Sequence, residues 1–408
     1  MPDARHYVVL GNGIAGTTAA ETLRKSDSDC RISLFTDEPY PLYNRVALPP
    51  YLKGKTPQSK LFMKTMEFHR ERNICLYPST RVTNVDVESQ TVVTDGSMET
   101  HYDRLLVATG GTPSHLAVPG GDADGVCYFQ TLDDTNDLIE RIMRARSAVA
   151  IGGSYISYEL AEGFRSRGLN VTWLIRGPRF LHRVLDNDGG DLVDKIARHH
   201  GVDMVYEDTA DHLETTGGRV AAVVTTKQRR FEADLVGCGL GLIYNHSFLA
   251  PGSVDVGYGI LTNEFLETNL DTVFAAGDIA DFYDPDLDKH YTMGTWASAT
   301  LHGRIAAQNM LGNRQPVHDV RQYTTTLFDS RMTVVGATPE VRPEIDGVSR
   351  VYPKGDNPSD WSYRRLFFFE KRLVGAALIG DMHAKVDLVK TIRAKEEVWG
   401  DRERLLSL

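Results

Sequence analysis

The chain has 408 residues, and its 45 lysine and arginine residues against 55 aspartate and glutamate residues give a formal net charge of -10. With 41% hydrophobic and 25% charged residues, it has the composition of a folded protein with room for several domains of roughly 100 to 200 residues each. An acidic balance without a concentrated run of lysine and arginine excludes nucleic acid and anionic membranes as main partners, because such binding depends on dense positive charge.

The cysteines are Cys30, Cys75, Cys127 and Cys238, far apart in the sequence. Their spacing excludes a disulfide framework and a close-spaced zinc or iron–sulfur motif, and it fits a reducing, cytoplasmic setting. The first apolar run, at residues 7–10, is far too short for a signal sequence or a membrane span. We therefore expect a cytoplasmic protein without a membrane anchor or a resident metal, as a monomer or a homodimer.

Residues 7–37 have the pattern of a complete nucleotide-binding unit. In chain order it consists of an apolar strand at 7–10, the turn GNGIAG at 11–16, a helix to about Lys25, a strand at 31–35 and an acid. Gly11 permits the tight turn, Gly13 lets the backbone approach a pyrophosphate, and Gly16 lets helix and strand pack closely. Asp37 is the acid that would bind an adenosine ribose. The alternative is a structural turn followed by a solvated aspartate.

A second unit of the same kind spans residues 148–175. In chain order it consists of an apolar strand at 148–151, the turn GGSYIS at 152–157, a helix from Tyr158 to Arg167 and a strand at 171–175. Ser154 and Ser157 replace the second and third glycines, which hinders the approach of a phosphate, although a serine hydroxyl can itself donate to one. We expect dinucleotide binding here, with a purely structural repeat as the alternative.

The end of this second unit indicates which nucleotide is used. Ile175 stands where a site selective for NAD usually has an acid, and Arg176, Arg179, His182 and Arg183 follow it. Cations at this place favour a 2′-phosphate, so we expect a preference for NADPH. The alternative is that these are solvated loop charges and that NADH is used equally well.

Each unit is followed by a strand that ends in a turn of small residues. The first such strand ends in ATG at 108–110 and the second in CG at 238–239, with Cys238 in the place of Thr109. Backbone crossings of this kind lie close to a bound nucleotide. Between the two units, residues 78–104 alternate between apolar and polar side chains and are broken by turn residues, which predicts a small meander.

Together with a later segment that ends in FAAGD at 274–278, these motifs resemble the FAD- and NAD(P)-dependent pyridine nucleotide oxidoreductases with two dinucleotide-binding domains. Within that family the sequence is most similar to ferredoxin and rubredoxin reductases, apoptosis-inducing factor and the flavin-binding N-terminal region of the nitrite reductase large subunit. The resemblance covers essentially the whole chain and implies an α/β fold with two Rossmann-like domains of three-layer ββα type and a C-terminal α+β interface domain. The expected boundaries are 1–120 and 246–320 for FAD, 121–245 for NAD(P)H and 321–408 for the interface domain.

The resemblance also implies individual roles. Arg45 would lie near the FAD phosphates, the backbone of Val82 near adenine, Asp278 at the ribityl chain, and Trp296 at a helix N-terminus facing the flavin pyrimidine, where the helix dipole stabilises negative charge. Alternatives are a surface turn for Asp278 and a plain core aromatic for Trp296. The residues expected to bind the two cofactors are Gly11, Gly13, Ile14, Ala15, Gly16, Asp37, Glu38, Arg45, Val82, Ala108, Thr109, Gly110, Gly152, Gly153, Ser154, Tyr155, Ile156, Glu159, Arg176, Arg183, Gly239, Gly277, Asp278, Thr295, Trp296 and Ala297.

Two residues of the second unit are the expected catalytic residues. By resemblance, Tyr155 lies across the nicotinamide face of the flavin and moves when the nucleotide arrives, and Glu159 lies beneath the flavin N5 region. In many relatives this glutamate pairs with a lysine, but Pro50 stands at that place here. Either Glu159 is protonated or paired differently, or Lys53 or another cation substitutes.

The same segment argues against a thiol relay, because related disulfide reductases carry cysteines where this chain has Val46. Electrons are then expected to leave directly from the flavin. Near the C-terminus, Arg364, Arg365, Lys371 and Arg372 form either a solvated face or a basic landing patch for an acidic electron carrier.

We therefore expect an FAD-dependent NAD(P)H oxidoreductase that reduces a small redox protein of the ferredoxin or rubredoxin class. A small-molecule acceptor such as a quinone or oxygen is one alternative. A slowly reduced FAD-binding sensor is another, favoured by the loss of the lysine and of two glycines.

Overall fold

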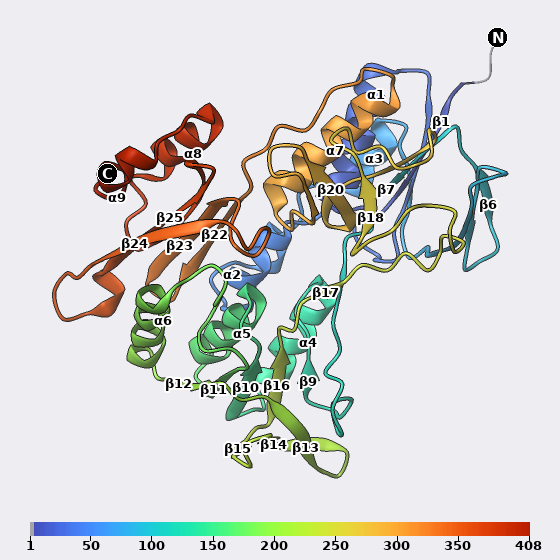
Figure 1. The fold of residues 1–408 in the computed structure, drawn as a ribbon. Helices are drawn as coiled ribbons and strands as arrows, with labels where there is room; N and C mark the ends of the chain where they lie inside the picture. The colour runs from blue at the N-terminus through green and yellow to red at the C-terminus, as the bar shows by residue number, and fades with distance from the viewer. Residues whose placement is uncertain (1–3) are drawn as a thin grey trace. The chain divides into compact units, whose positions relative to one another are not determined.

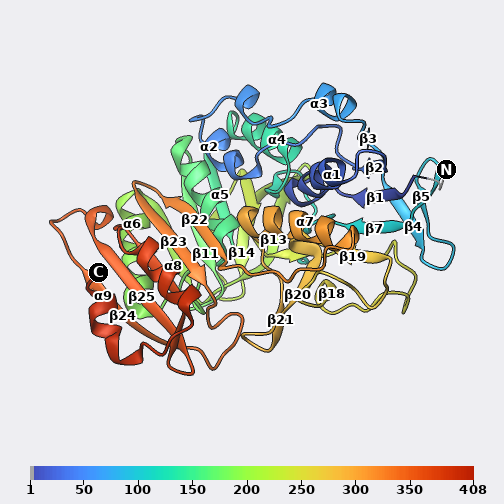
Figure 2. The same cartoon turned by 90° about the horizontal axis from the view of Figure 1, so that it is seen from above.

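The computed structural model describes residues 4–408, whose course is drawn in Figure 1 and Figure 2. The chain divides into two compact units. The first contains the described residues up to Asn44 together with 58–112 and 243–321, and the second contains 45–57, 113–242 and 322–408. Within the described residues no helix is both long and apolar enough to cross a membrane, and no group of three or more acidic, histidine or cysteine side chains is placed to hold a metal ion.

A five-stranded parallel sheet, in the order β19-β7-β1-β2-β3, is the core of the first unit. All five residues of its central strand β1 are buried, as expected for a parallel strand covered on both faces. Two three-stranded sheets, β4-β5-β6 and β18-β20-β21, complete the unit. Its strands are β1 (His6–Leu10), β2 (Arg31–Phe35), β3 (Cys75–Tyr77), β4 (Val82–Asp86), β5 (Thr91–Thr94), β6 (Glu99–His101), β7 (Arg104–Val107), β18 (Ile260–Thr262), β19 (Val273–Ala275), β20 (Ala280–Asp284) and β21 (Lys289–Tyr291).

Helices α1 (Ile14–Ser26) and α7 (Trp296–Met310) lie side by side in this unit (Figure 1, Figure 2). They approach closely because Gly303 has no side chain: a Cβ there would lie 2.1 Å from the carbonyl oxygen of Ala15. The remaining helical elements of the unit are η2 (Gln58–Lys60), α3 (Met66–Glu71) and η3 (Gly277–Ile279).

The second unit repeats this plan with a parallel sheet in the order β12-β11-β10-β16-β9 and a meander β13-β14-β15. Its central strand β10 pairs with β11 and β16 as β1 pairs with β2 and β7. The elements are β9 (Val126–Cys127), α4 (Leu132–Ile142), β10 (Ser147–Ile151), α5 (Tyr155–Ser166), β11 (Asn170–Ile175), α6 (Asn187–His199), β12 (Val202–Tyr206), β13 (Ala210–Thr216), β14 (Arg219–Thr225), β15 (Arg230–Glu232) and β16 (Leu235–Cys238), with η1 (Arg45–Ala47) and α2 (Leu48–Leu52) from earlier in the chain. The short strands β8 (Thr112–Pro113) and β17 (Leu242–Ile243) stand at the sequence boundaries of the units.

The rest of the second unit is an antiparallel sheet in the order β22-β23-β26-β25-β24. Helices α8 and α9 cover one face of this sheet, and α6 lies toward the other (Figure 1, Figure 2). The elements are β22 (Gln322–Leu327), β23 (Ser330–Gly336), β24 (Asp346–Tyr352), η4 (Pro358–Asp360), β25 (Ser362–Phe369), β26 (Arg372–Ile379), α8 (Lys385–Ala394), η5 (Trp399–Asp401) and α9 (Arg402–Leu406). The expected α/β fold, with two Rossmann-like domains and a C-terminal α+β portion, is confirmed.

Candidate functional site

The first glycine-rich turn is packed so closely that two of its glycines admit no side chain. Gly11 has a φ of 103°, and a Cβ there would lie 2.2 Å from the carbonyl oxygen of Ala108. A Cβ at Gly16 would lie 1.9 Å from the carbonyl oxygen of Gly11. The turn between β1 and α1 is therefore held against the end of β7, where the Ala108 N–H donates to the carbonyl oxygen of Leu10 at 2.8 Å.

Gly13 behaves differently, because a Cβ there would meet nothing within 4 Å. It is the N-cap of α1, has extended backbone and supplies no side-chain cap, and the first turn of the helix carries no acidic residue. The N–H groups of Ile14 and Ala15 thus begin a helix whose positive end faces open space. This is the arrangement that receives a phosphate, so the residues present fit the FAD pyrophosphate.

Helix α7 and the turn after β19 meet α1 at the same end of the sheet. Gly277, with a φ of 75°, lies where a Cβ would be 3.2 Å from the Cβ of Ala15, and Asp278 follows it in η3. Trp296 is the first residue of α7, as expected, and the side chain of Thr295 caps the helix by accepting from the N–H of Ser298 at 3.2 Å.

Asp37 and Val82 are brought to one end of the first sheet. The chain after β2 runs beside residues 79–81, and the Thr80 N–H donates to the carbonyl oxygen of Thr36 at 2.8 Å. Arg81, next to Val82, pairs with Asp37 at 3.0 Å, both side chains being more than half exposed. Glu38 accepts a 2.6 Å hydrogen bond from Tyr43. A ribose that binds to Asp37 would therefore have to compete with Arg81 for the carboxylate, in an ion pair that is exposed to solvent.

The second glycine-rich turn is closed by its serines. The Ser154 side chain accepts from the Ser157 N–H at 3.4 Å, and the Ser157 side chain accepts from the Ser154 N–H at 3.0 Å, which forms a capping box. The Ser154 hydroxyl also donates to the carbonyl oxygen of Gly239 at 2.8 Å. Because of this cap α5 begins at Tyr155, so the prediction of a helix start at Tyr158 was wrong by three residues.

The repeat between the units is in a different register from the one expected. Leu10 pairs with Val107 in the first sheet, and Ile151 pairs with Cys238 in the second. Cys238 therefore corresponds to Val107, inside a buried strand, and its expected place at Thr109 is corrected by two positions. Gly239 corresponds to Ala108, and a Cβ at Gly152 would lie 2.2 Å from the carbonyl oxygen of Gly239, as at the first turn.

Tyr155, the first residue of α5, belongs to an aromatic group. Its ring centroid lies 3.9 Å from that of Tyr323 on β22, with 38° between the planes, and 6.2 Å from that of Phe180. Tyr323 follows Tyr155 by more than 150 residues in the chain, and no sequence motif marks it. The sequence predicted no role for it, because residues 321–408 were expected only to form the C-terminal interface domain.

Glu159 lies one helical turn after Tyr155 and is 8% exposed. Its Oε1 accepts hydrogen bonds from the Tyr323 hydroxyl at 3.0 Å and, more weakly, from the Thr325 hydroxyl at 3.4 Å. Burial raises the pKa of the Glu159 carboxyl to about 7, against the opposing effects of the Tyr323 bond and the charge of Lys53. The carboxyl is therefore poised to exchange a proton near neutral pH.

Lys53 forms its ion pair with Glu162 and not with Glu159. The Lys53 Nζ lies 2.8 Å from Glu162 Oε1, and the two side chains are 3% and 2% exposed. Thr326 accepts from the same Nζ at 3.0 Å, and the Tyr158 hydroxyl donates to the other oxygen of Glu162. Lys53, three residues after Pro50, therefore does not replace the missing lysine as the partner of Glu159. It pairs with Glu162, and Glu159 is hydrogen-bonded to Tyr323 instead.

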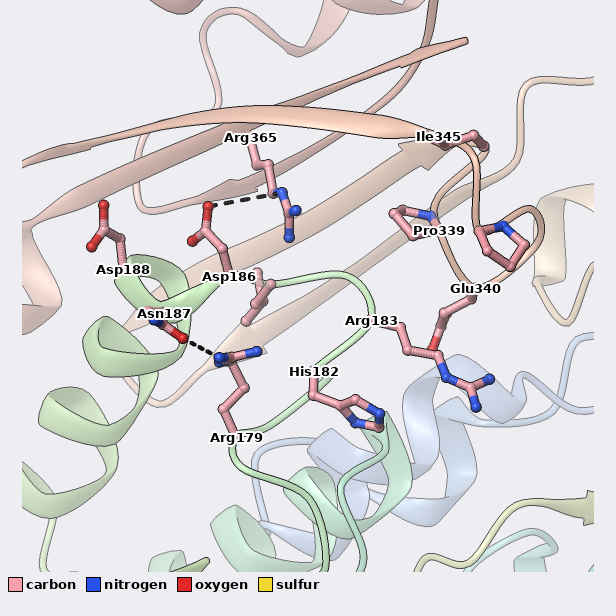
Figure 3. Close-up of a pocket in the computed structure, with 12 residues that line it drawn as sticks. Arg179, His182, Arg183, Asp186, Asn187, Asp188, Pro339, Glu340, Ile345 and Arg365 are labelled. Atoms are coloured by element: carbon pink, nitrogen blue, oxygen red, sulfur yellow. Dashed lines mark hydrogen bonds and ion pairs between the residues drawn. The ribbon is translucent and has the colours of Figure 1, made fainter.

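Some of the cations expected at the NADPH phosphate line a cavity of about 840 Å³ (Figure 3). Arg179, His182 and Arg183 come from the loop after β11, and Glu340 faces them from the loop after β23. Arg179 donates to Asn187 at the start of α6. Arg176 is exposed and is not among the residues that line this cavity.

Arg45 lies in the second unit, where its guanidinium donates to the carbonyl oxygen of Gln130 at 2.6 Å. Gln130 immediately precedes Thr131, the N-cap of α4. This bond fixes the start of the segment that carries α2 and Lys53 against α4.

Arg364 and Arg365, two residues of the expected basic landing patch, do not share an exposed surface. Successive residues on a strand point to opposite faces. Arg364 is 5% exposed and donates to the carbonyl oxygens of Leu405 and Leu406, whereas Arg365 donates to the carbonyl oxygen of Val184 at 3.0 Å. The hypothesis that these two arginines receive an acidic protein together is therefore wrong.

Comparison with known proteins places the whole arrangement among flavin-linked reductases. Residues 5–303 match the family described as pyridine nucleotide-disulphide oxidoreductase. The nitrite reductase [NAD(P)H] of Bacillus subtilis is 27% identical over 395 residues, which are 97% of this chain and 48% of that protein. The chain thus spans about half the length of that relative.

Two further similarities cover most of this chain and most of the protein to which it is compared. Putidaredoxin reductase of Pseudomonas putida is 30% identical over 316 residues, which are 75% of this chain and 74% of that protein. The crystal structure of a covalent putidaredoxin reductase–putidaredoxin complex matches with a TM-score of 0.85 at 25% identity, over 96% of this chain and 94% of that one.

Proposed function

The chain belongs to the pyridine nucleotide-disulphide oxidoreductase family, and from this premise we propose that it passes electrons from NAD(P)H through FAD to a small redox protein of the ferredoxin or rubredoxin class. It is an FAD-dependent NAD(P)H oxidoreductase. When bound, FAD supplies the acceptance of a hydride and its release as electrons. The protein supplies the binding, the orientation and the placement of charge.

The observation that carries the choice of acceptor is the state of the thiols. Cys30, Cys127 and Cys238 are buried, and burial raises the pKa of Cys30 to about 11 and those of Cys127 and Cys238 to about 12. Cys75 is exposed on β3, and all four are free. A thiolate relay needs a reactive cysteine beside the flavin, and the segment that carries it in related disulfide reductases has Val46 here. Without one, electrons leave from the cofactor itself, which suits an outer acceptor such as a one-electron carrier.

In this proposal each unit holds one cofactor by its glycine-rich turn. In the first, the uncapped start of α1 binds the FAD pyrophosphate, and Asp37, Val82, Asp278 and Trp296 bind the rest. In the second, the start of α5 receives NAD(P)H, with Tyr155 at the nicotinamide and Glu159 holding a proton at its carboxyl oxygen. Hydride transfer then depends on positioning more than on acid–base chemistry.

We further propose that NADPH is preferred, because Ile175 offers no carboxylate to a 2′-hydroxyl and the loop after it carries His182 and Arg183 at the edge of the cavity. The relatives support the choice of acceptor. One relative is named putidaredoxin reductase, and one similar crystal structure is a covalent complex of putidaredoxin reductase with putidaredoxin.

The test is an anaerobic stopped-flow measurement of the flavin absorbance band. Loss of the oxidised band within milliseconds of mixing with NADPH, more slowly with NADH, is the expected result. The reduced protein is then mixed with a ferredoxin, a rubredoxin, a quinone or oxygen. Reoxidation that is fast only with a protein carrier supports the proposal, and equally fast reoxidation by quinone or oxygen replaces it with a small-molecule acceptor. Reduction over minutes by both nucleotides would favour a sensor.

A further inference from the structure

Tyr323 touches both of the expected catalytic residues, one through its hydroxyl and the other through its ring. Its hydroxyl donates to Glu159 at 3.0 Å, and its ring lies 3.9 Å from that of Tyr155, centroid to centroid. Glu159 and Tyr155 are one turn apart on α5, so a single residue from β22 spans the face that they share.

The strength of the hydrogen bond between Tyr323 and Glu159 depends on the charge of the Glu159 carboxyl. When Glu159 is ionised, the phenolic O–H donates to a carboxylate, and such charge-assisted bonds are about twice as strong as neutral ones. When Glu159 is protonated, the same pair is joined by a neutral bond. Burial and the negative charge of Glu159 hold the pKa of Tyr323 well above its usual value, so the tyrosine stays a donor throughout.

The neighbouring cation does not remove this sensitivity, because Lys53 is bound by Glu162 in a pair that is itself buried. Burial places the pKa of Glu159 at about 7, within the range where enzymes work. The titratable and charged groups that face Glu159 are Tyr155, Tyr158 and Glu162 on its own helix, Lys53 at the end of α2, and Tyr323 on β22, with the Thr325 hydroxyl beside it.

We propose that Tyr323 is a positioning residue: ionisation of Glu159 tightens its hydrogen bond to Tyr323, which fixes the Tyr323 ring and, through the ring contact, the ring of Tyr155. The inference rests on the proposed function for its consequence, since Tyr155 begins the helix that is proposed to receive NAD(P)H. Contacts between aromatic rings stabilise their packing beyond the area that they bury, so a fixed Tyr323 ring restrains the partly exposed ring of Tyr155.

The test places 3-fluorotyrosine at position 155 of the FAD-loaded protein and follows its fluorine NMR signal with pH, without added nucleotide. The wild-type signal is expected to shift or sharpen with a midpoint near the Glu159 pKa. In Tyr323→Phe the ring remains but the hydroxyl is gone, so the response of the signal should be lost. The infrared band of the protonated carboxyl should still titrate in that variant, which shows that Glu159 is intact.

Thr325→Val is the matched control, because it removes the weaker donor to Glu159 and leaves the contact between the rings of Tyr323 and Tyr155. Its fluorine response should persist with a midpoint moved to higher pH, since the ionised carboxylate has lost a donor. Glu159→Gln should abolish both the carboxyl band and the response. A response that survives in Tyr323→Phe, or is absent from the wild type, would overturn the proposal.

The ratio of the NADPH dissociation constants at about pH 6 and about pH 8 is then expected to differ at least about twofold between the wild type and Tyr323→Phe, since titration of the 2′-phosphate contributes equally to both. This separates the two proposals. If NADPH neither binds nor reduces the flavin, the proposed function fails, while the fluorine titration still decides whether Tyr323 positions Tyr155. A folded variant is verified by its circular dichroism melt.

Discussion

The two glycine-rich turns occupy the same place in two parallel sheets, yet they present different surfaces to a ligand. At the first, Gly13 caps α1 without a side chain, and a Cβ at this position would meet nothing within 4 Å. At the second, Ser154 and Ser157 satisfy each other's N–H groups. The comparison teaches that the strand–turn–helix framework fixes where a phosphate can approach, whereas the cap residues decide how many donors remain for it.

The helices behind the two turns differ as well. Counted from the first helical residue, Tyr155 and Glu159 of α5 correspond to Ile14 and Thr18 of α1. Glu159 thus has no charged counterpart in α1, where Thr18 stands. Glu162 corresponds to Glu21, which pairs with Lys64 at 2.6 Å, but those side chains are 22% and 23% exposed, whereas Lys53 and Glu162 are 3% and 2% exposed. The face of α5 that carries Glu159 is therefore where stability and binding should depend most on pH and on buried charge.

The largest expected effect comes from the buried Lys53–Glu162 pair of the second unit. Lys53→Met leaves Glu162 without its cation and should lower the free energy of unfolding by about 3–5 kcal/mol. Arg70→Met breaks an exposed pair with Glu67 in the first unit and should cost about 1 kcal/mol or less. Denaturant unfolding checks both, and Lys53→Met combined with Glu162→Leu should recover most of the loss. Equal losses for Lys53→Met and Arg70→Met would contradict the prediction.

The next effect compares the first glycine of each turn. Gly11→Ala and Gly152→Ala each place a Cβ 2.2 Å from a carbonyl oxygen at positive φ, and each should lower stability by about 2–4 kcal/mol. The first should lose FAD, whereas the second should keep FAD and lose reduction by NADPH.

Gly168→Ala is the control for both, because its φ of 89° is also positive but its Cβ would meet nothing within 4 Å. It should show only the conformational cost, about 1–2 kcal/mol. Flavin content and stopped-flow reduction measure the functional difference. If Gly152→Ala sheds FAD as readily as Gly11→Ala, the assignment of one cofactor to each turn is wrong.

The third effect is the pH dependence contributed by Glu159. Its folded pKa of about 7 lies above the unfolded value of 4.5, so between these values the folded state holds more protons. The contribution of this carboxyl to stability is therefore most favourable at low pH and is lost as the pH rises toward 7, by up to about 3 kcal/mol. The difference between wild type and Glu159→Gln in unfolding titrations isolates it. A difference that grows in the opposite direction would show that the carboxylate is ionised in the folded protein.

The smallest expected effect comes from exchanging the N-cap residues of α1 and α5. Gly13→Ser adds a competing cap to α1 and should weaken FAD binding roughly two- to tenfold, the range of one net hydrogen bond. Ser154→Gly frees the Ser157 N–H and should tighten NADPH binding by a similar factor, at a cost of a few tenths of a kcal/mol in stability. Equilibrium titrations of both ligands provide the test. Unchanged affinities would mean that the caps do not limit the donors.

Much of this arrangement could be predicted because it is local in the sequence. The two strand–turn–helix units, the meander after the first and the helix that starts at Trp296 follow from runs of apolar residues, glycines and caps within about 30 residues. The roles of the individual cofactor-binding residues remain predictions, with Asp37 and Val82 at one end of the first sheet and Arg45 in the second unit.

What could not be predicted depends on strand register and on contacts between distant segments. Cys238 was misplaced because it was matched through the glycine that follows it, whereas strand pairing makes it the last residue of β16, as Val107 is the last residue of β7. Arg364 and Arg365 are neighbours in the chain but point to opposite faces of β25, which a count of charges cannot show.

The sequence by itself determined that this protein has two dinucleotide-binding units and lacks a cysteine pair spaced for a thiol relay, since spacing along the chain carries that information. Only the tertiary structure decided the partners of the buried charges. It gave Lys53 to Glu162 and Tyr323 to Glu159, over separations of 109 and 164 residues. The physical reason is that burial makes an unpaired charge costly, so the partner is whichever donor the packing of α2, α5 and β22 brings within reach.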